Sequence, residues 1–332
     1  MLKIDAFTHI LPMKYYETIH KIMGPGFYKK LHETMSTMYD LDYRFRLMDK
    51  FEGLMQVITI AGPPVEDIAE PKQAADLAML ANDEMAELIY KYPDRFAAGV
   101  AWLPMNDMDA ALKETDRAIK DLKFRGVQIY TPLRDKSLDL PEFLPLYEKM
   151  AQYNLPIWIH PTRPRDYPDY RTEKISEYRI HWYFGWPYET SAAMARLVMS
   201  GILEKYPDLK FITHHAGAMV PFFAQRIVAG LDHTEMLQRA NFKENLRRPV
   251  LDYYKMFYAD TAVMGSVPAL TCAYDFFGAE HLLFASDWPF DSQRGERSTR
   301  ETIDSIERMD ISDVEKKMIF EDNVRRLLRL AV

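Results

Sequence analysis

The sequence predicts an α/β fold, a (β/α)8 barrel of the TIM type formed by a single domain over residues 1–332. Short apolar runs alternate with longer segments of helical period, and several runs are apolar throughout, as in strands buried on both faces. There are eight such runs, the number of parallel strands that closes a barrel. Strands are therefore predicted at Leu2–Phe7, Leu54–Ile60, Phe96–Ala101, Arg125–Tyr130, Pro156–His160, Lys210–His214, Met256–Ala259 and Leu282–Ser286.

Two segments are too long to be simple turns between a strand and its helix. Residues 12–40 and residues 162–188 are rich in aromatic side chains, and both follow the carboxyl end of a predicted strand. A barrel carries its active-site loops at that end. Near the end of the chain, residues 312–330 are expected to form a capping helix, with Ser312 as N-cap and Glu315 three residues later.

The composition is that of a globular protein, with 48% hydrophobic and 27% charged residues. A net charge of −7 argues against binding to nucleic acid or to an anionic membrane surface. The one cysteine excludes an internal disulfide and a Cys-rich zinc site. Neither a signal-peptide pattern nor an apolar window of about 18 residues is found, so we expect a cytoplasmic protein that acts on a small molecule.

Histidine and aspartate side chains stand at the ends of several predicted strands. His9 follows the first strand, His160 ends the fifth, His214 and His215 end the sixth, and Asp287 follows the eighth. In a closed barrel the carboxyl ends of all strands converge on one rim, so these side chains are expected to lie together. Imidazole and carboxylate are suitable ligands for zinc, manganese or iron. A single histidine is more often structural, but several on one rim indicate a site.

These motifs resemble those of the amidohydrolase superfamily, in the branch that contains aminocarboxymuconate-semialdehyde decarboxylase and the γ-resorcylate decarboxylases. The resemblance covers nearly the whole chain and implies a barrel of the metal-dependent hydrolase type. The motifs that carry it are Ile4–Pro12, Leu155–Pro161, His215–Pro221, Leu283–Pro289 and Asn323–Leu328.

The resemblance also implies roles for the residues at the rim. By position in the motifs, His9, His160 and Asp287 would bind one divalent transition metal, with zinc favoured and manganese as the alternative. His215 matches the histidine proposed as general acid/base, because Pro221 follows it by six residues as in the family. Asp287 would share in the catalysis.

One position departs from the family's pattern. Phe7 stands where the first ligand of the first strand is expected, and phenylalanine cannot bind a metal. Three protein ligands are sufficient for a catalytic zinc. Three outcomes therefore stay open: a three-ligand metal site, a replacement ligand such as His181, or loss of the metal. His214 is expected to face the barrel wall, because neighbouring residues of a strand point to opposite sides.

The long loop after the fifth strand suits a lid over an anionic or aromatic substrate. Its candidate substrate-binding residues are Arg163, Arg165, His181 and Trp186. Arg226, eleven residues after His215, matches an arginine that in the decarboxylases reaches a neighbouring subunit's site. The resemblance therefore implies a homodimer or a larger homo-oligomer.

Three functions remain in competition at this point. The resemblance favours a metal-dependent carbon–carbon lyase that decarboxylates an aromatic or unsaturated carboxylic acid. The same residues would serve a hydrolase of a lactone, ester or amide, because a fold does not fix the chemistry. The third is a non-catalytic barrel that has lost its metal together with the ligand at position 7.

Overall fold

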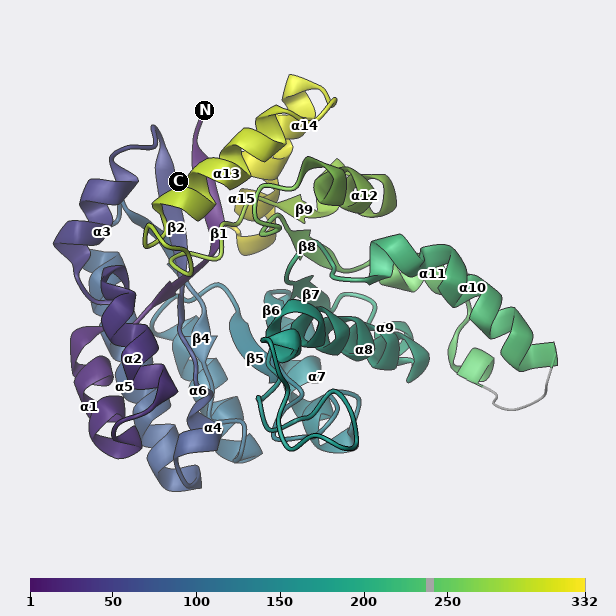
Figure 1. Ribbon diagram of the computed structural model, residues 1–332, viewed down its shortest axis with the longest axis horizontal. Helices are drawn as coiled ribbons and strands as arrows, with labels where there is room; N and C mark the ends of the chain where they lie inside the picture. Colours follow the sequence, from purple (N-terminus) through teal and green to yellow (C-terminus); the bar gives the residue numbers. More distant parts are fainter. Residues whose placement is uncertain (237–241, 332) are drawn as a thin grey trace.

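The computed structural model describes residues 1–236 and 242–331 (Figure 1). Its strands form a three-stranded sheet in the order β1-β2-β3 and a six-stranded sheet in the order β4-β5-β6-β7-β8-β9, with every pair parallel. The strands are β1 (Lys3–Ile10), β2 (Leu54–Ile60), β3 (Phe96–Gly99), β4 (Ala101–Trp102), β5 (Val127–Thr131), β6 (Pro156–Pro161), β7 (Lys210–Thr213), β8 (Tyr258–Asp260) and β9 (Leu282–Leu283).

The strands β3 and β4 are two parts of one predicted strand, interrupted at Val100. The backbone N–H of Val100 donates to the carbonyl of Ile58 in β2 at 3.1 Å, and that of Ala101 donates to Gly126 beside β5 at 2.9 Å. The chain therefore changes partner at this point, and the two sheets are continuous through it.

The first strand also pairs with the segment that follows β9. The N–H of Ala6 donates to the carbonyl of Phe284, and the N–H of His9 donates to the carbonyl of Trp288, each at 2.8 Å. These bonds close the ring of parallel strands. The barrel predicted from the sequence is confirmed, and all eight predicted strands overlap strands of the structure.

Helices cover the outside of the barrel (Figure 1). The long helices that follow strands are α5 (Pro71–Lys91), α6 (Met108–Lys120), α7 (Leu144–Tyr153), α8 (Trp186–Met199), α10 (Val220–Met236), α12 (Val267–Phe277) and α13 (Glu296–Glu307). Shorter helices are α3 (Leu41–Met48), α4 (Val65–Ile68), α9 (Ile202–Lys205), α11 (Val250–Tyr254), α14 (Asp313–Lys317) and α15 (Asn323–Leu328). None of the helices in the described ranges is long and apolar enough to cross a membrane.

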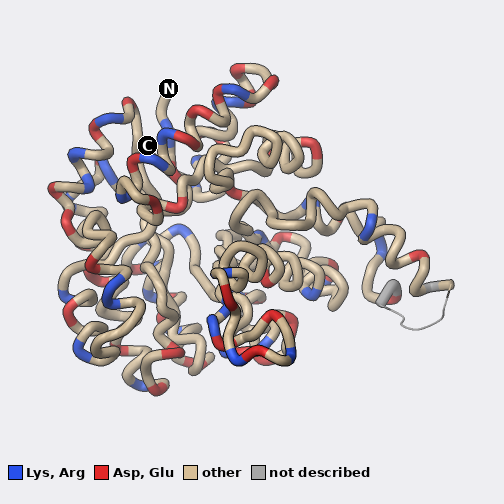
Figure 2. The backbone as a smooth tube through the Cα atoms, in the orientation of Figure 1, with Lys and Arg blue, Asp and Glu red and all other residues tan. Residues whose placement is uncertain are grey.

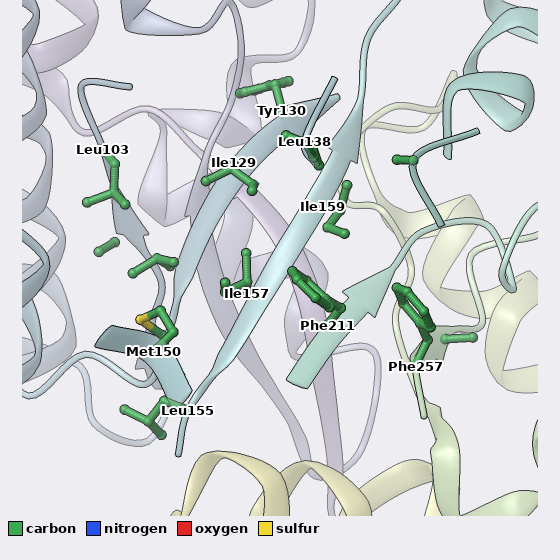
Figure 3. Close-up of a cluster of buried hydrophobic side chains, with 14 of the residues drawn as sticks. Leu103, Ile129, Tyr130, Leu138, Met150, Leu155, Ile157, Ile159, Phe211 and Phe257 are labelled. Carbon is green, nitrogen blue, oxygen red and sulfur yellow. The ribbon is translucent and has the colours of Figure 1, made fainter. Parts of the chain in front are cut away.

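The strand residues alternate between the helical shell and the barrel interior. In β6, Ile157 and Ile159 belong to the core cluster that includes helix residues such as Met150, as Figure 3 shows. Trp158 belongs to the inner cluster instead, and its indole N–H donates to the carbonyl of Ala6 at 3.2 Å. The same alternation turns His160, two residues further on, toward the interior.

The capping segment at the end of the chain begins at Ser312. The Ser312 hydroxyl accepts from the N–H of Glu315 at 3.3 Å, and the Glu315 carboxylate accepts from the N–H of Ser312 at 2.9 Å. This reciprocal pair is the capping box expected from the sequence. A π-helical turn, Met318–Asp322, joins α14 to α15.

The insertion after β1 is helical. It contains α1 (Met13–Met23), α2 (Phe27–Thr34) and a 3₁₀ turn at Ser36–Met38. A chain of histidines ties it to the barrel, because His20 Nε2 lies 2.9 Å from His32 Nδ1 and His32 Nε2 lies 2.9 Å from the carbonyl of Gly62, just beyond β2. With the carbonyl as acceptor, His32 donates from Nε2 and accepts from His20 at Nδ1.

A buried arginine connects α3 to the first two strands. Arg44 donates from Nε to the Gln56 side chain at 2.7 Å, from Nη1 to the carbonyl of His9 at 2.7 Å, and from Nη2 to the Thr8 hydroxyl at 3.0 Å. Its side chain is fully buried. The guanidinium therefore fixes the end of β1 at the point where His9 enters the site.

We expect Arg44→Met to lower the free energy of unfolding by about 3–5 kcal/mol, because it removes a buried cation and leaves its acceptors unpaired. The matched control is Arg46→Met, since Arg46 is exposed on the same helix, and its change should be within about 0.5 kcal/mol. Urea unfolding of both variants provides the measurement. Equal urea midpoints for the two variants would show that Arg44 does not stabilise the end of β1.

The buried His32 predicts a loss of stability in mild acid. Burial lowers the pKa of His32 from 6.5 to about 4, so the native state keeps it neutral while the unfolded chain takes up a proton below about pH 6.5. Its contribution to stability is therefore complete above pH 6.5 and is lost as the pH falls toward 4. His32→Gln keeps a donor for the Gly62 carbonyl and does not titrate.

Between pH 7 and pH 5 the wild type should lose about 2 kcal/mol more stability than His32→Gln. Urea unfolding at the two pH values measures the difference. Parallel losses in the two proteins would mean that protonation of His32 is not linked to unfolding.

Candidate functional site

Three of the predicted site residues meet where the barrel closes. His9 lies in β1 and is fully buried, and its Nε2 is 3.2 Å from Oδ1 of Asp287, which follows β9. His160, at the end of β6, places its ring centroid 5.4 Å from that of His9. The three side chains predicted as metal ligands therefore lie on one rim of the barrel.

His215 approaches the same carboxylate from the turn that follows β7. Its Nε2 lies 3.9 Å from Oδ2 of Asp287, and its side chain is about one-fifth exposed, so it is accessible to a small molecule. The backbone holding it is strained, because the four residues 215–218 all have φ between 56° and 75°. Left-handed backbone at non-glycine residues persists only where the surroundings enforce it, and it gathers at functional sites.

Proximity of these groups sets their protonation. Burial alone would raise the pKa of Asp287, but the His215 and His9 imidazoles outweigh it and hold that pKa well below its usual range. Burial, with His9 as the next cause, lowers the pKa of His160 far below its ordinary value, so His160 is neutral. Burial lowers the pKa of His215, but the Asp287 and Asp260 carboxylates outweigh burial, so this pKa is raised overall.

The expectation that His214 faces the barrel wall is wrong. Its ring centroid lies 5.5 Å from that of His160 and 3.7 Å from that of Phe7, inside the barrel. β7 ends at Thr213, so the alternation of a regular strand no longer applies at His214. Its Nδ1 lies 2.9 Å from Oδ2 of Asp260, and both side chains are fully buried.

Phe7 occupies the interior beside these histidines. Its ring centroid is 4.5 Å from that of His9 and 5.7 Å from that of His160. The register of β1 against β2 shifts between Asp5 and Thr8, so one extra residue of β1 is accommodated there. Bulges of this kind redirect side chains next to active sites.

The donor types at this rim fit a divalent transition metal. The rim offers two buried imidazoles and an ionised carboxylate, and zinc and manganese accept both kinds of ligand. Among residues 1–236 and 242–331, no group of three His, Cys, Asp or Glu side chains is arranged to hold an ion. The set suits the metal in its chemistry and lacks a donor at position 7, where the phenyl ring of Phe7 stands.

The two candidate arginines of the long loop are engaged by acidic partners. Arg163 forms an ion pair with Glu189 at 2.6 Å, and Arg165, which is largely exposed, lies 3.8 Å from Glu177. Charges of both signs follow one another along this loop (Figure 2). These pairs shape the loop itself, whose last part is the π-helical turn His181–Gly185.

The aromatic candidates of this loop differ in their placement. Trp186, the first residue of α8, lies with its ring centroid 5.5 Å from that of His160, so it borders the site. His181 is tied to the loop, where its backbone N–H donates to the Ser176 hydroxyl at 2.9 Å.

The last candidate, Arg226, belongs to the helix α10. It is exposed on α10, which extends away from the barrel beside α11 in Figure 1. Phe222 and Phe223, on the same helix, are 78% and 40% exposed, which makes this an apolar surface near a cation.

Sequence reasoning missed three side chains of the site. Asp260 ends β8 and pairs with His214, Tyr130 lies in β5 with its ring 4.8 Å from that of His160, and Phe290 lies 5.0 Å from His9. Asp260 and Tyr130 stand at strand ends, so the criterion that found Asp287 also applies to them.

The chain was compared with known proteins. It is 31% identical to a γ-resorcylate decarboxylase of Polaromonas sp. strain JS666 over 314 residues, which cover 90% of each chain. It is 27% identical to a 2-amino-3-carboxymuconate-6-semialdehyde decarboxylase of Dictyostelium discoideum, with 99% of this chain and 92% of that protein covered.

Among solved structures, the fold is similar to that of a dihydroxybenzoic acid decarboxylase from Polaromonas sp. JS666 with bound manganese and the inhibitor 2-nitroresorcinol. The TM-score is 0.79 at 28% identity, covering 99% of this chain and 97% of that one. The family described as Amidohydrolase matches residues 4–330. The resemblance inferred from the motifs is therefore confirmed, and the chain belongs to the amidohydrolase family.

Proposed function

We propose that this protein is a metal-dependent carboxy-lyase that removes the carboxylate of a small aromatic carboxylic acid as carbon dioxide. The observation that carries the proposal is the meeting of His9, His160, His215 and Asp287 at one rim of the barrel. The decarboxylases to which the chain is similar support the choice of a lyase over a hydrolase.

His9, His160 and Asp287 would hold one divalent transition metal. Zinc is our first candidate from the ligand types, and the manganese in the related dihydroxybenzoic acid decarboxylase makes manganese the alternative. When bound, the ion supplies Lewis-acid polarisation of an oxygen atom of the substrate.

His215 is the proposed proton donor. In the reaction, the bond between the ring carbon and the carboxyl carbon breaks, carbon dioxide leaves, and the electron pair stays on the ring carbon. That carbon then takes a proton from the His215 imidazolium, which regains one from water. The Asp287 carboxylate, 3.9 Å from His215 Nε2, favours the charged imidazolium before the transfer.

The remaining assignments concern the surroundings of the site. Trp186 would stack against the substrate ring, and Arg163, Arg165 and His181 would form the loop that covers it. We further propose a cytoplasmic enzyme of one domain, of which residues 237–241 and 332 lie outside the described part of the chain. Exposed Phe222 and Phe223 beside Arg226 favour α10 as the contact of a homodimer or larger homo-oligomer.

A substrate panel tests the proposed reaction. Hydroxybenzoates and lactones are incubated with the metal-loaded enzyme, and carbon dioxide release is measured beside acid production. The proposal expects carbon dioxide from at least one hydroxybenzoate and no acid from the lactones. Lactone hydrolysis without decarboxylation would show that the protein is a hydrolase and would contradict the proposed lyase.

The role of His215 can be separated from that of the ligands. His215→Ala should lower kcat by about 10²–10⁴-fold, because general acid catalysis is lost, while the bound metal is retained. His281→Ala is the control, since His281 bonds the carbonyl of Phe257 and lies outside the cluster. Turnover and metal content are measured on the same samples. Unchanged turnover in His215→Ala would show that the proton comes from another group.

Asp287→Asn should abolish turnover, because it removes the charge that both the metal and His215 require. The far-ultraviolet circular dichroism should stay the same, since asparagine has nearly the same shape. A variant that keeps its activity would contradict the assignment of Asp287.

A further inference from the structure

We propose that His214 supplies the metal ligand that the chain lacks at Phe7, with Asp260 as the carboxylate that orients it. The inference rests on the metal of the proposed function, and it concerns a histidine that the family's motif leaves without a role.

The hydrogen bond to Asp260 fixes which nitrogen of His214 is free. The Asp260 carboxylate accepts at Oδ1 from the N–H groups of Ala216 and Ala262, at 3.1 and 3.0 Å, which leaves Oδ2 for His214 Nδ1 at 2.9 Å. The Asp260 side chain accepts in these contacts, so in its pair with His214 it is Nδ1 that carries the proton. Nε2 is therefore a bare lone pair, the form in which imidazole binds a metal.

That lone pair is buried without a protein partner. Among the described residues, no hydrogen-bond donor contacts His214 Nε2, and the side chain is fully buried. A buried acceptor left unpaired destabilises the folded state. A histidine whose other nitrogen donates to a carboxylate is the arrangement that metal-binding histidines show, and a bound ion would satisfy Nε2.

His214 lies beside the position of the missing donor. Its ring lies against that of Phe7, with centroids 3.7 Å apart and the planes tilted by 31°, and the centroid of the His160 ring lies 5.5 Å away. The imidazole thus stands directly beside the residue that interrupts the ligand set. His181, the alternative replacement considered from the sequence, belongs to the loop around Ser176.

The test measures metal affinity without substrate. Mn²⁺ and Zn²⁺ dissociation constants are determined by chelator competition, and the Co²⁺ form is examined by its visible absorption. His214→Asn keeps an N–H donor for Asp260 and removes the Nε2 lone pair. Affinity for both ions should fall by more than about tenfold, with a changed Co²⁺ spectrum. Asp260→Asn removes the carboxylate that orients His214, and it should weaken metal binding by about 10–100-fold.

His281→Asn is the matched control, because its histidine bonds a backbone carbonyl outside the cluster, and it should bind the ions as the wild type does. A complementary variant restores a donor at position 7. Phe7→Glu should recover most of the lost affinity in the His214→Asn background and should add less in the wild type.

Wild-type affinity and an unchanged Co²⁺ spectrum in His214→Asn would overturn the inference while leaving the decarboxylase proposal intact. A wild type that binds no metal would overturn it as well, whatever the substrate panel shows. Metal binding that depends on His214 would support it even in a protein that decarboxylates none of the hydroxybenzoates.

Discussion

The structure depends on the closure of the barrel between its first strand and the segment after β9. The bond from the His9 N–H to the Trp288 carbonyl joins residues 279 positions apart in the chain and places His9 beside Asp287. Asp5 strengthens the same seam by accepting from the backbone N–H and the hydroxyl of Ser286, and burial raises the pKa of Asp5 to about 7. The geometry of the site is therefore a consequence of closure.

Much of the fold and of the site could be predicted from strand ends alone. His9, His160 and Asp287 lie together because eight buried runs close a ring and bring their carboxyl ends to one rim. His214 lies inside the barrel, against the expectation from strand alternation, because β7 stops at Thr213 and the residues beyond it form a left-handed turn. Hydrogen bonding and packing in three dimensions determine such a turn, and no local residue pattern predicts it.

The residues of the long loop after β6 show a second limit of prediction from the sequence. Their charge makes Arg163 and Arg165 candidates for binding an anion, but Glu189 and Glu177 lie within ion-pair distance of them. Composition identifies a loop that is able to bind an anion, whereas the partners of each cation follow from how the loop folds back on α8. Trp186, by contrast, sits at a helix start close to β6, where the barrel itself sets its position beside His160.

The central claim is that a carboxylate is exchanged for a proton at this rim. Turnover of each substrate of the panel, carried out in D₂O and in parallel in ¹⁸O-labelled water and analysed by mass spectrometry and NMR, tests it most directly. We expect one deuterium in the product, on the carbon that had carried the carboxylate. A product that retains its carboxylate and takes up ¹⁸O from labelled water would contradict the account, because water would then be the attacking reagent of a hydrolysis.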